Sequence, residues 1–459
     1  MLSSLLLGTL QLVCVLLLSA ALGVRVLALC RVPLRVLHTW EKPVLGIALG
    51  LGFWQFLPFV LFALHLGKPF QIVIGAGLLA VLLSKDIVHI LRAVKPALLK
   101  IKVEGSSERG FAVLMGVLLT ILFLRALLPA IDGDVSSYHL PSVLRYLRAG
   151  GFIYLPTLTP TNWQLGVQML YALLLSFNAE APTSLIPYLC GVLTLGVMAL
   201  WAYRLVGVKG VVWVLGLYLV LDRFSYQGFW YQMSSSLIDL GLTLFATCGA
   251  YTLYRAMEGH EEERGDWLRL SALFAGLAGT TKLTGIWVVV SLGVVLCIAL
   301  RKGGASPAKL LRHTGQYVLI AMCLIAPWLV KTWVLTGNPL YPMFYRVFGG
   351  IEWTAEGWAL YQRSHLIWNT PAGKMPTPQV LAQTHLQIAG LGTLLGLLFM
   401  VWSRKKQYAI PAMFAAAFFI CISVGNFFHL RFLMPSFPCI MVCFACLLTR
   451  FQRLYTWFL

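Results

Sequence analysis

The sequence predicts an all-α integral membrane protein with about 13 transmembrane helices and further helices at the outer membrane surface. Hydrophobic residues make up 59% of the 459 residues and charged residues 11%, a balance far from that of soluble domains. Many apolar runs approach the roughly 20 residues that cross a hydrocarbon core. They lack the alternation of transmembrane β-strands, which argues against a β-barrel.

Each predicted helix is an apolar run between charged or polar residues. The predicted spans are about residues 5–23, 44–65, 69–85, 111–130, 185–204, 210–222, 234–256, 268–282, 284–300, 315–333, 386–402, 409–424 and 433–449. Residues 1–23 lack a basic start, so we expect a retained helix and not a cleaved signal peptide. The apolar segment 163–177 is short, and a span there would carry later basic loops to the outer side. We therefore predict a juxtamembrane helix for it.

Basic residues set the predicted orientation. The formal net charge of +19 at pH 7 comes from short clusters between apolar runs, a pattern typical of cytoplasmic loops and not of a nucleic-acid-binding surface. These clusters share one side if the N-terminus is outside and the C-terminus cytoplasmic. Two long outer loops result, about 131–182 and 333–385, and such loops are usually functional or disordered. The ten cysteines lie in or beside apolar runs, so we assign neither disulfides nor a metal framework.

Two aspartates, Asp132 and Asp134, directly follow the apolar run 110–130 in a chain with only 16 acidic residues. Pro129 and Gly133 interrupt the helix there, so the pair is expected at the outer membrane surface. The pair is either a polar helix end that meets water or part of a functional site. Its spacing alone leaves both interpretations open.

Further ionisable residues lie near the outward ends of spans or in the outer loops. They are Asp222, Asp239, Lys282, Lys331, Glu352, Glu356, His365, His429 and Arg431. Ionisable groups at membrane depth are costly unless they are paired or functional. A carboxylate can act as a base or hold a divalent cation, whereas Lys and Arg can bind phosphate. The alternative for each is a snorkelling side chain or a structural ion pair.

Five stretches resemble, in order, elements of the glycosyltransferase C superfamily, especially bacterial members similar to dolichyl-phosphate-mannose protein mannosyltransferases. The first, Asp134-Val-Ser-Ser-Tyr-His-Leu-Pro141, is similar to the Asp-x-x-x-Tyr-His-Leu-Pro element of the first outer loop. The others are Ser236–Leu240, Gly276–Lys282, Ala326–Lys331 continuing to Thr336–Pro342, and Arg431–Pro435. Together these stretches cover about residues 111–449. We therefore predict that residues 1–103 form a separate segment of about three helices with a basic cytoplasmic stretch, and that residues 104–459 form the glycosyltransferase C-like domain.

The resemblance implies an enzyme that moves a sugar, with inversion, from a polyprenyl-phosphate donor to an acceptor at the outer face. Asp134 matches the family's catalytic carboxylate and Asp239 its second acidic position. The positions assigned to substrate binding are Tyr138, His139, Lys282, Lys331, Tyr341 and Arg431. Asp132 has no counterpart in the pattern; we assign it, with Asp239, to a divalent cation such as Mg²⁺ or Mn²⁺. The bacterial resemblance places the protein in a bacterial inner membrane with its site facing the periplasm.

The chemistry of these residues agrees with the implied reaction. A positioned base such as Asp134 accelerates proton transfer about 10²–10⁴-fold, and basic residues or a cation offset the charge on the leaving phosphate. The resemblance implies an acceptor that is a cell-envelope glycan, a lipid or a protein. Two alternatives stay open. One is a lipid-linked sugar transporter or flippase, which the polar residues at span ends disfavour. The other is an envelope polysaccharide polymerase or ligase, for which Arg363 and His365 are candidates.

Overall fold

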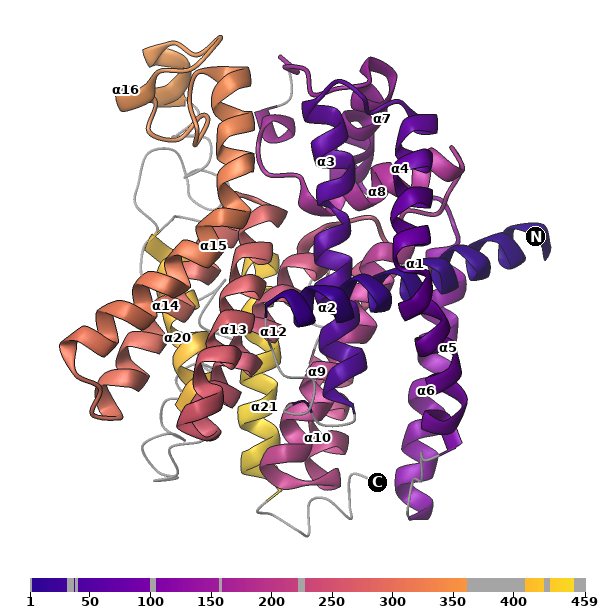
Figure 1. Cartoon of the computed structure of the whole chain (residues 1–459), viewed down its shortest axis with the longest axis vertical. Coiled ribbons are helices and arrows are strands. Elements are labelled where there is room, and N and C mark those ends of the chain that lie inside the picture. The colour runs from indigo at the N-terminus through magenta and orange to yellow at the C-terminus, as the bar shows by residue number, and fades with distance from the viewer. Residues whose placement is uncertain are drawn as a thin grey trace. The chain divides into compact units, whose positions relative to one another are not determined.

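The computed structural model describes residues 2–30, 37, 40–99, 105–156, 159–221, 228–360, 409–424 and 430–449. Every regular element in these ranges is a helix, which confirms the predicted all-α class; Figure 1 follows them from α1 in indigo to α21 in yellow. The chain forms two compact units. The first unit is Met1–Phe152, Gly166–Cys248 and Phe444–Leu459, and the second unit is Ile153–Leu165 and Gly249–Cys443. The predicted separation of residues 1–103 from the rest stays a prediction.

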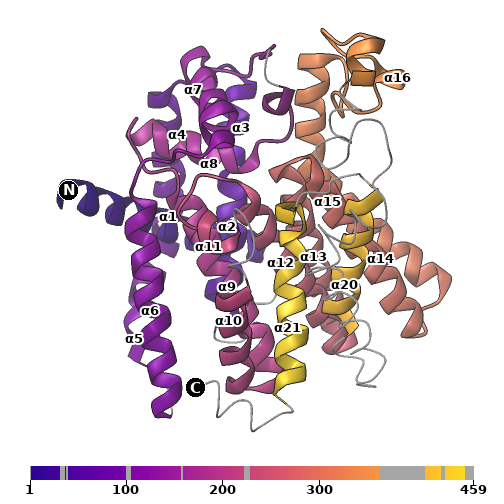
Figure 2. The same ribbon diagram turned by 180° about the vertical axis from the view of Figure 1, so that it is seen from behind.

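Closely packed helices build the first unit. Its elements are α1 (Leu2–Leu29), α2 (Glu41–Trp54), α3 (Phe56–Ala63), α4 (Pro69–Leu82), α5 (Ser84–Leu99), α6 (Ser106–Ala126), η1 (Val135–His139), α7 (Leu140–Ala149), α8 (Gly166–Phe177), α9 (Leu185–Val206), α10 (Val208–Leu221), α11 (Phe229–Gln232) and the start of α12 (Asp239–Glu258). A Cβ atom on Gly50 of α2 would lie 1.8 Å from the Ser19 carbonyl oxygen of α1, so a glycine is needed where these helices meet. Helices α9 and α10 form a hairpin around Gly207, whose φ is +76° (Figure 2).

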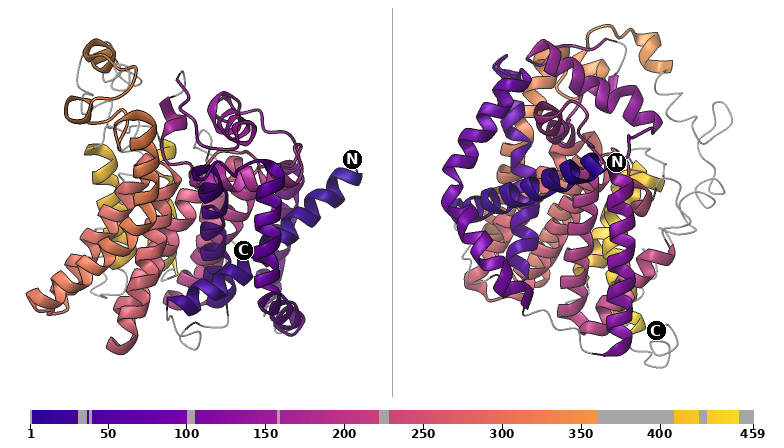
Figure 3. Two further views of the ribbon diagram at one scale, coloured as in Figure 1. Left: turned by 45° about the horizontal axis from the view of Figure 1, so that its top comes forward. Right: turned by 90° about the vertical axis from the view of Figure 1, so that its right-hand side faces the viewer.

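Three long helices, α13, α14 and α15, run beside one another in the second unit (Figure 3, left). Its elements are η2 (Thr159–Asn162), α13 (Glu261–Thr281), η4 (Leu283–Gly285), α14 (Ile286–Lys302), α15 (Pro307–Thr336), α16 (Tyr345–Phe348), α20 (Ala409–Val424), η7 (Leu430–Ser436) and the start of α21 (Phe437–Leu448). Helices α13 and α14 form a tight hairpin. A Cβ atom on Gly285 would lie 2.0 Å from the Ala278 carbonyl oxygen, so the turn requires glycine.

Seven helices in the described ranges are long and apolar enough to cross a membrane, or eight if the pair α4 and α5, bent by 64°, is one span. Three apolar helices, α8, α10 and α20, are shorter. The predicted span 386–402 lies outside the described residues. The total of about 13 spans therefore stays a prediction.

Two helices of the first outer loop differ in their surroundings. Helix α7 is amphipathic: Val143, Tyr146 and Leu147 are buried, and Arg145 and Arg148 are exposed. Helix α8, predicted as a juxtamembrane helix, is buried in the protein at every residue from 166 to 174. This burial suits a helix with apolar residues on all sides. Its position relative to the membrane stays a prediction.

Candidate functional site

A non-helical stretch follows the end of α6 at Ala126 and leads through Asp132 to one π-helical turn, η1 (Val135–His139). Asp134 stands directly before this turn and is half-buried. The backbone N–H and the hydroxyl of Ser136 donate to the Asp132 carbonyl at 2.9 and 3.0 Å, which ties the turn to the first aspartate. Short π-helical turns are frequent at functional sites. The local backbone thus presents Asp134 at the edge of the first unit's core.

Asp132 is the more buried of the two aspartates, with 7% of its surface exposed. Its Oδ1 accepts a hydrogen bond from the hydroxyl of Tyr231 in α11. A hydroxyl donor to a carboxylate is a charge-assisted bond, stronger than one between neutral groups. Tyr231 therefore fixes the direction of the Asp132 carboxylate.

His139 ends η1 and is buried, with 2% of its surface exposed. Its Nδ1 lies 2.9 Å from Nε2 of Gln168 in α8. This contact links the imidazole ring to the side-chain amide of α8. The Tyr138 ring lies 4.3 Å from the His139 ring and is half-exposed. Of these two predicted substrate-binding residues, Tyr138 is the more accessible, whereas His139 holds the turn against α8.

Asp239 is the first residue of α12 and is 3% exposed. Its Oδ2 accepts from Nε2 of Gln232 at 3.4 Å. The non-helical stretch before it is held by Ser236, whose hydroxyl lies 2.6 Å from the Thr183 hydroxyl and 3.0 Å from the Ser184 hydroxyl. These bonds prevent α12 from starting earlier, at the predicted residue 234, and leave Asp239 at a helix N-terminus. A carboxylate is favoured there by the helix dipole.

Adjacent residues of α11 bind the two buried carboxylates: Tyr231 reaches Asp132 and Gln232 reaches Asp239. This link is the structural basis for treating the two aspartates as one site. The carboxylate oxygens suit Mg²⁺ or Mn²⁺. Across the described ranges, no group of three or more His, Cys, Asp or Glu is arranged to hold a metal ion. The cation at Asp132 and Asp239 stays a prediction.

Two predicted phosphate ligands meet in the second unit. Lys282 follows the end of α13 in an extended conformation, with its Nζ 4.5 Å from the centroid of the Phe432 ring. The Cζ of Arg431 lies 5.5 Å from the same centroid. Lys282 and Arg431 are distant in sequence and both half-buried. An aromatic face stabilises cations at these distances, and two neighbouring cations form a region that attracts an anion.

Lys331, predicted to bind substrate, is 6% exposed in α15. Its Nζ donates to the carbonyls of Asn162 and Trp163 at 2.9 and 2.8 Å. The neighbouring Thr332 hydroxyl also donates to the Asn162 carbonyl, at 2.8 Å. Lys331 and Thr332 therefore clamp η2 and the residue after it to α15.

Tyr341 lies in a hydrogen-bonded group of the second outer loop and is 2% exposed. Its hydroxyl accepts from Nε1 of Trp353 at 2.8 Å and lies 3.3 Å from the Tyr154 hydroxyl. Tyr154 also donates to Oε2 of Glu352 at 2.8 Å. Burial, and then the bonds to Tyr341 and Glu352, raise the pKa of Tyr154 above its ordinary value. The buried Tyr341 supports the loop, and Glu352 and Trp353 lie nearer its surface.

The structure thus groups the predicted residues within each unit. The first unit holds Asp132, Asp134, Tyr138, His139 and Asp239, and the second unit holds Lys282, Lys331, Tyr341 and Arg431. Some candidates lie outside the described residues: Asp222, His429, and the pair Arg363 and His365. The substrate-binding and catalytic roles of all these residues stay predictions.

Three residues of the site were missed by reasoning from the sequence: Tyr231, Gln232 and Gln168. A signal for Gln168 was present, because a lone amide in an apolar helix needs a buried hydrogen-bond partner. Gln232 and Tyr231 give a weaker signal, as polar groups that precede the Ser234–Asp239 stretch. The partner of Tyr231 is 99 residues away and that of Gln232 is 7 residues away, so the pairing itself requires the structure.

Known structures share this fold. The chain resembles the crystal structure of ArnT from Cupriavidus metallidurans in the apo state, with a TM-score of 0.51 and 18% sequence identity over 74% of this chain and 60% of that chain. The structure of the same ArnT bound to undecaprenyl phosphate gives a TM-score of 0.51 and 17% identity over 73% of this chain and 60% of that chain. The chain therefore spans about 60% of the length of these neighbours. The likeness confirms the predicted glycosyltransferase C-like membrane fold.

The sequence comparisons identify a family. No curated protein sequence matches the chain. The chain belongs to the family described as domain of unknown function (DUF8201), whose sequence profile matches residues 1–367.

Proposed function

We propose that the protein is a glycosyltransferase that takes a sugar from a polyprenyl-phosphate donor and transfers it to an acceptor at the outer face of a bacterial inner membrane. The observation that carries this proposal is the fold shared with ArnT, which has been crystallised with undecaprenyl phosphate. The buried carboxylates of the first unit and the paired cations of the second unit support it, because both kinds of group suit this chemistry.

Asp134 is the proposed general base. An acceptor oxygen attacks the anomeric carbon of the sugar, its proton passes to the Asp134 carboxylate, and the bond between the anomeric carbon and the phosphate oxygen breaks. Attack from the face opposite the phosphate inverts the anomeric configuration. The half-buried position of Asp134 beside the η1 turn suits this role, because its side chain is not sealed in the core.

Lys282 and Arg431 are the proposed ligands of the donor phosphate. The departing phosphate gains negative charge as the glycosidic bond breaks, and nearby fixed cations stabilise that charge. Their shared contact with Phe432 restricts both side chains before the donor arrives. Tyr138, half-exposed beside the catalytic turn, is a proposed contact for the sugar. A divalent cation at Asp132 and Asp239 is a separate proposed source of positive charge.

The orientation and the acceptor are also part of this proposal. The positive-inside rule predicts that Asp132 and Asp134 lie on the side opposite the cytoplasm, where a lipid-linked sugar would be delivered for envelope synthesis. The acceptor classes consistent with the reaction are a cell-envelope glycan, a lipid or a protein.

The test is sugar transfer by the purified full chain in detergent, with a panel of radiolabelled synthetic polyprenyl-phosphate sugars. We expect transfer by the wild type and loss of transfer in Asp134→Asn, with donor binding retained. Asp266→Asn is the matched control, since it makes the same chemical change at a carboxylate paired with Arg269. If both proteins move labelled lipid across proteoliposomes equally well and form no glycosidic product, the enzyme is ruled out and a lipid-linked sugar transporter replaces it.

A further inference from the structure

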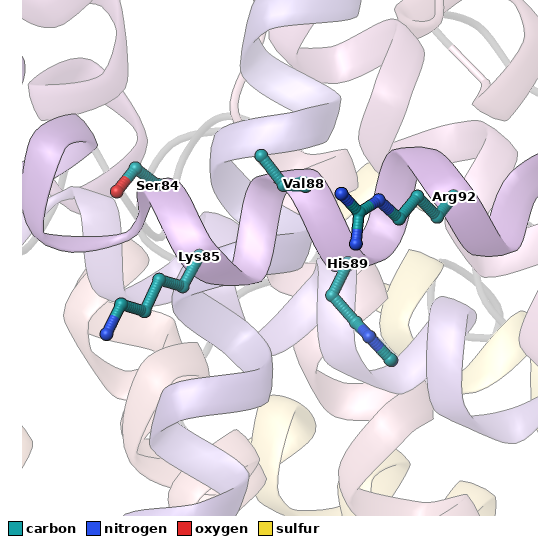
Figure 4. A pocket seen from close by; sticks show the side chains of 5 residues that line it. All are labelled: Ser84, Lys85, Val88, His89 and Arg92. Atoms are coloured by element: carbon teal, nitrogen blue, oxygen red, sulfur yellow. The ribbon is translucent and has the colours of Figure 1, made fainter.

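A basic pocket lies on α5, directly after the 64° bend that follows α4. It has a volume of about 400 Å³, and the described residues that line it are Ser84, Lys85, Val88, His89 and Arg92 (Figure 4). These five residues recur at helical spacing, so they lie along one face of α5. Figure 4 shows the ammonium, imidazole and guanidinium groups projecting from this face. Four of the five side chains can donate hydrogen bonds, which suits a phosphate.

The charge of this pocket is not balanced by its neighbours. Within the described part of the chain, Lys85, His89 and Arg92 form no hydrogen bond or ion pair. The nearest acid in the sequence, Asp86, is held by Arg25 of α1, whose Nε lies 2.6 Å from its Oδ2. The carboxylate that could neutralise the pocket is therefore already engaged.

An apolar stripe on α4 leads to the pocket. Ile74, Leu78, Val81 and Leu82 are 57, 64, 71 and 73% exposed, and the first three recur at the spacing of one helical face. From Ile74 to Leu82 the helix rises about 12 Å, which is the reach of roughly ten methylene groups. Val88 and Leu91 extend the exposed apolar surface along α5, at 45 and 53%. The stripe and the pocket together match an amphiphile with an apolar chain and an anionic head.

We propose that this pocket binds the headgroup phosphate of an anionic glycerophospholipid, with an acyl chain lying along α4. Lys85 and Arg92 neutralise the phosphate, Ser84 and His89 donate hydrogen bonds, and the α4 stripe covers the chain. In the predicted orientation this places the lipid in the cytoplasmic leaflet, where anionic lipids attract basic segments beside a membrane span. The site is independent of the proposed transferase chemistry, since none of its residues belongs to the carboxylate site or the Lys282 region.

The experiment measures lipid binding to the full chain by native mass spectrometry. The purified protein in neutral detergent is titrated with phosphatidylglycerol and, separately, with phosphatidylcholine of the same acyl chains. The variants are Lys85→Gln and Arg92→Gln, alone and combined. The matched control is Arg301→Gln with Lys302→Gln, which removes the same charge from two exposed residues at the end of α14. Leu78→Ser tests the acyl-chain contact.

We expect phosphatidylglycerol to bind more tightly than phosphatidylcholine. Each single substitution should weaken its binding by about five-fold and the combined variant by about 25-fold, with the α14 control unchanged. Leu78→Ser should weaken both lipids by a similar factor. Each single variant retains one cation and can be compared even if the combined variant folds poorly.

Three results would overturn the proposal. Equal affinity for the two lipids would show that the pocket does not recognise the anionic headgroup. Equal losses in the α5 and α14 variants would show attraction to overall charge and no specific site. Full displacement of phosphatidylglycerol by millimolar inorganic phosphate would show that the pocket takes a soluble anion.

Discussion

Lys331 offers a direct choice between two roles, because the resemblance assigns it to substrate whereas its contacts clamp a loop. Its Nζ donates to the Asn162 and Trp163 carbonyls, and the side chain is 6% exposed. The informative substitution is Lys331→Met, which keeps the length of the side chain and removes its donors. We expect the main effect to be loosening of residues 159–165.

The size of this effect follows from what each carbonyl retains. The Asn162 carbonyl still accepts from the Thr332 hydroxyl at 2.8 Å, whereas the Trp163 carbonyl loses the Lys331 donor. Leaving one buried carbonyl unsatisfied costs about 1–3 kcal/mol. Thr332→Val alone should cost about 1 kcal/mol or less, because Lys331 still serves Asn162. The double variant orphans both carbonyls, so its cost should exceed the sum of the single costs by about 1–2 kcal/mol.

Hydrogen exchange of the residue 159–165 amides measures this local opening. For Lys331→Met we expect protection to fall about 5–150-fold, the factor that corresponds to the expected 1–3 kcal/mol. Lys309→Met is the matched control at the other end of α15. Lys309 forms an exposed pair with Glu261 at 3.0 Å, and its loss should leave residues 159–165 unchanged. Unchanged exchange in Lys331→Met, together with lost donor binding, would refute the clamp and make Lys331 a substrate ligand.

Three further predictions concern the site and the outer loop. Tyr231→Phe removes the donor to Asp132 and should slow sugar transfer about 5–30-fold, the loss expected for about 1–2 kcal/mol. The control Tyr188→Phe removes a hydroxyl bound to the Leu119 carbonyl and should leave the rate unchanged. Equal rates in the wild type and both variants would exclude a role for the Tyr231 bond. Phe432→Leu removes the ring beside Lys282 and Arg431 and should raise the KM for the donor about 2–30-fold with a smaller change in kcat, since a contact of this kind is worth about 0.5–2 kcal/mol. An unchanged KM would count against phosphate binding there. The pKa of Tyr154 is raised in the folded state, so the contribution of this residue to stability is complete below the unfolded pKa of about 10 and falls at higher pH. Tyr154→Phe should therefore flatten the loss of thermal stability above about pH 10. Parallel curves of melting temperature against pH for the two proteins would contradict the raised pKa.

The carboxylate site shows which parts of a functional centre can be read from a sequence. The Asp134 element was visible because its residues are contiguous and directly follow an apolar run that ends at a proline. Asp239 was visible as an acid at the edge of another apolar run. Its exact setting was not, because the start of α12 depends on bonds from Ser236 to Thr183 and Ser184, some 50 residues earlier.

By itself, the sequence determined the membrane-embedded helical class, most helix positions, and the motifs that resemble the glycosyltransferase C superfamily. These properties depend on local patterns: a long apolar run is costly to hydrate wherever it lies, and a glycine or proline restricts the backbone at its own position. Only the tertiary structure decided that α8 is a core helix, that Tyr231 and Gln232 hold two carboxylates, that Lys331 grips a loop, and that Lys282 and Arg431 share one ring. Each of these depends on a partner brought close by packing, and the free energy of a buried polar group is set by that partner.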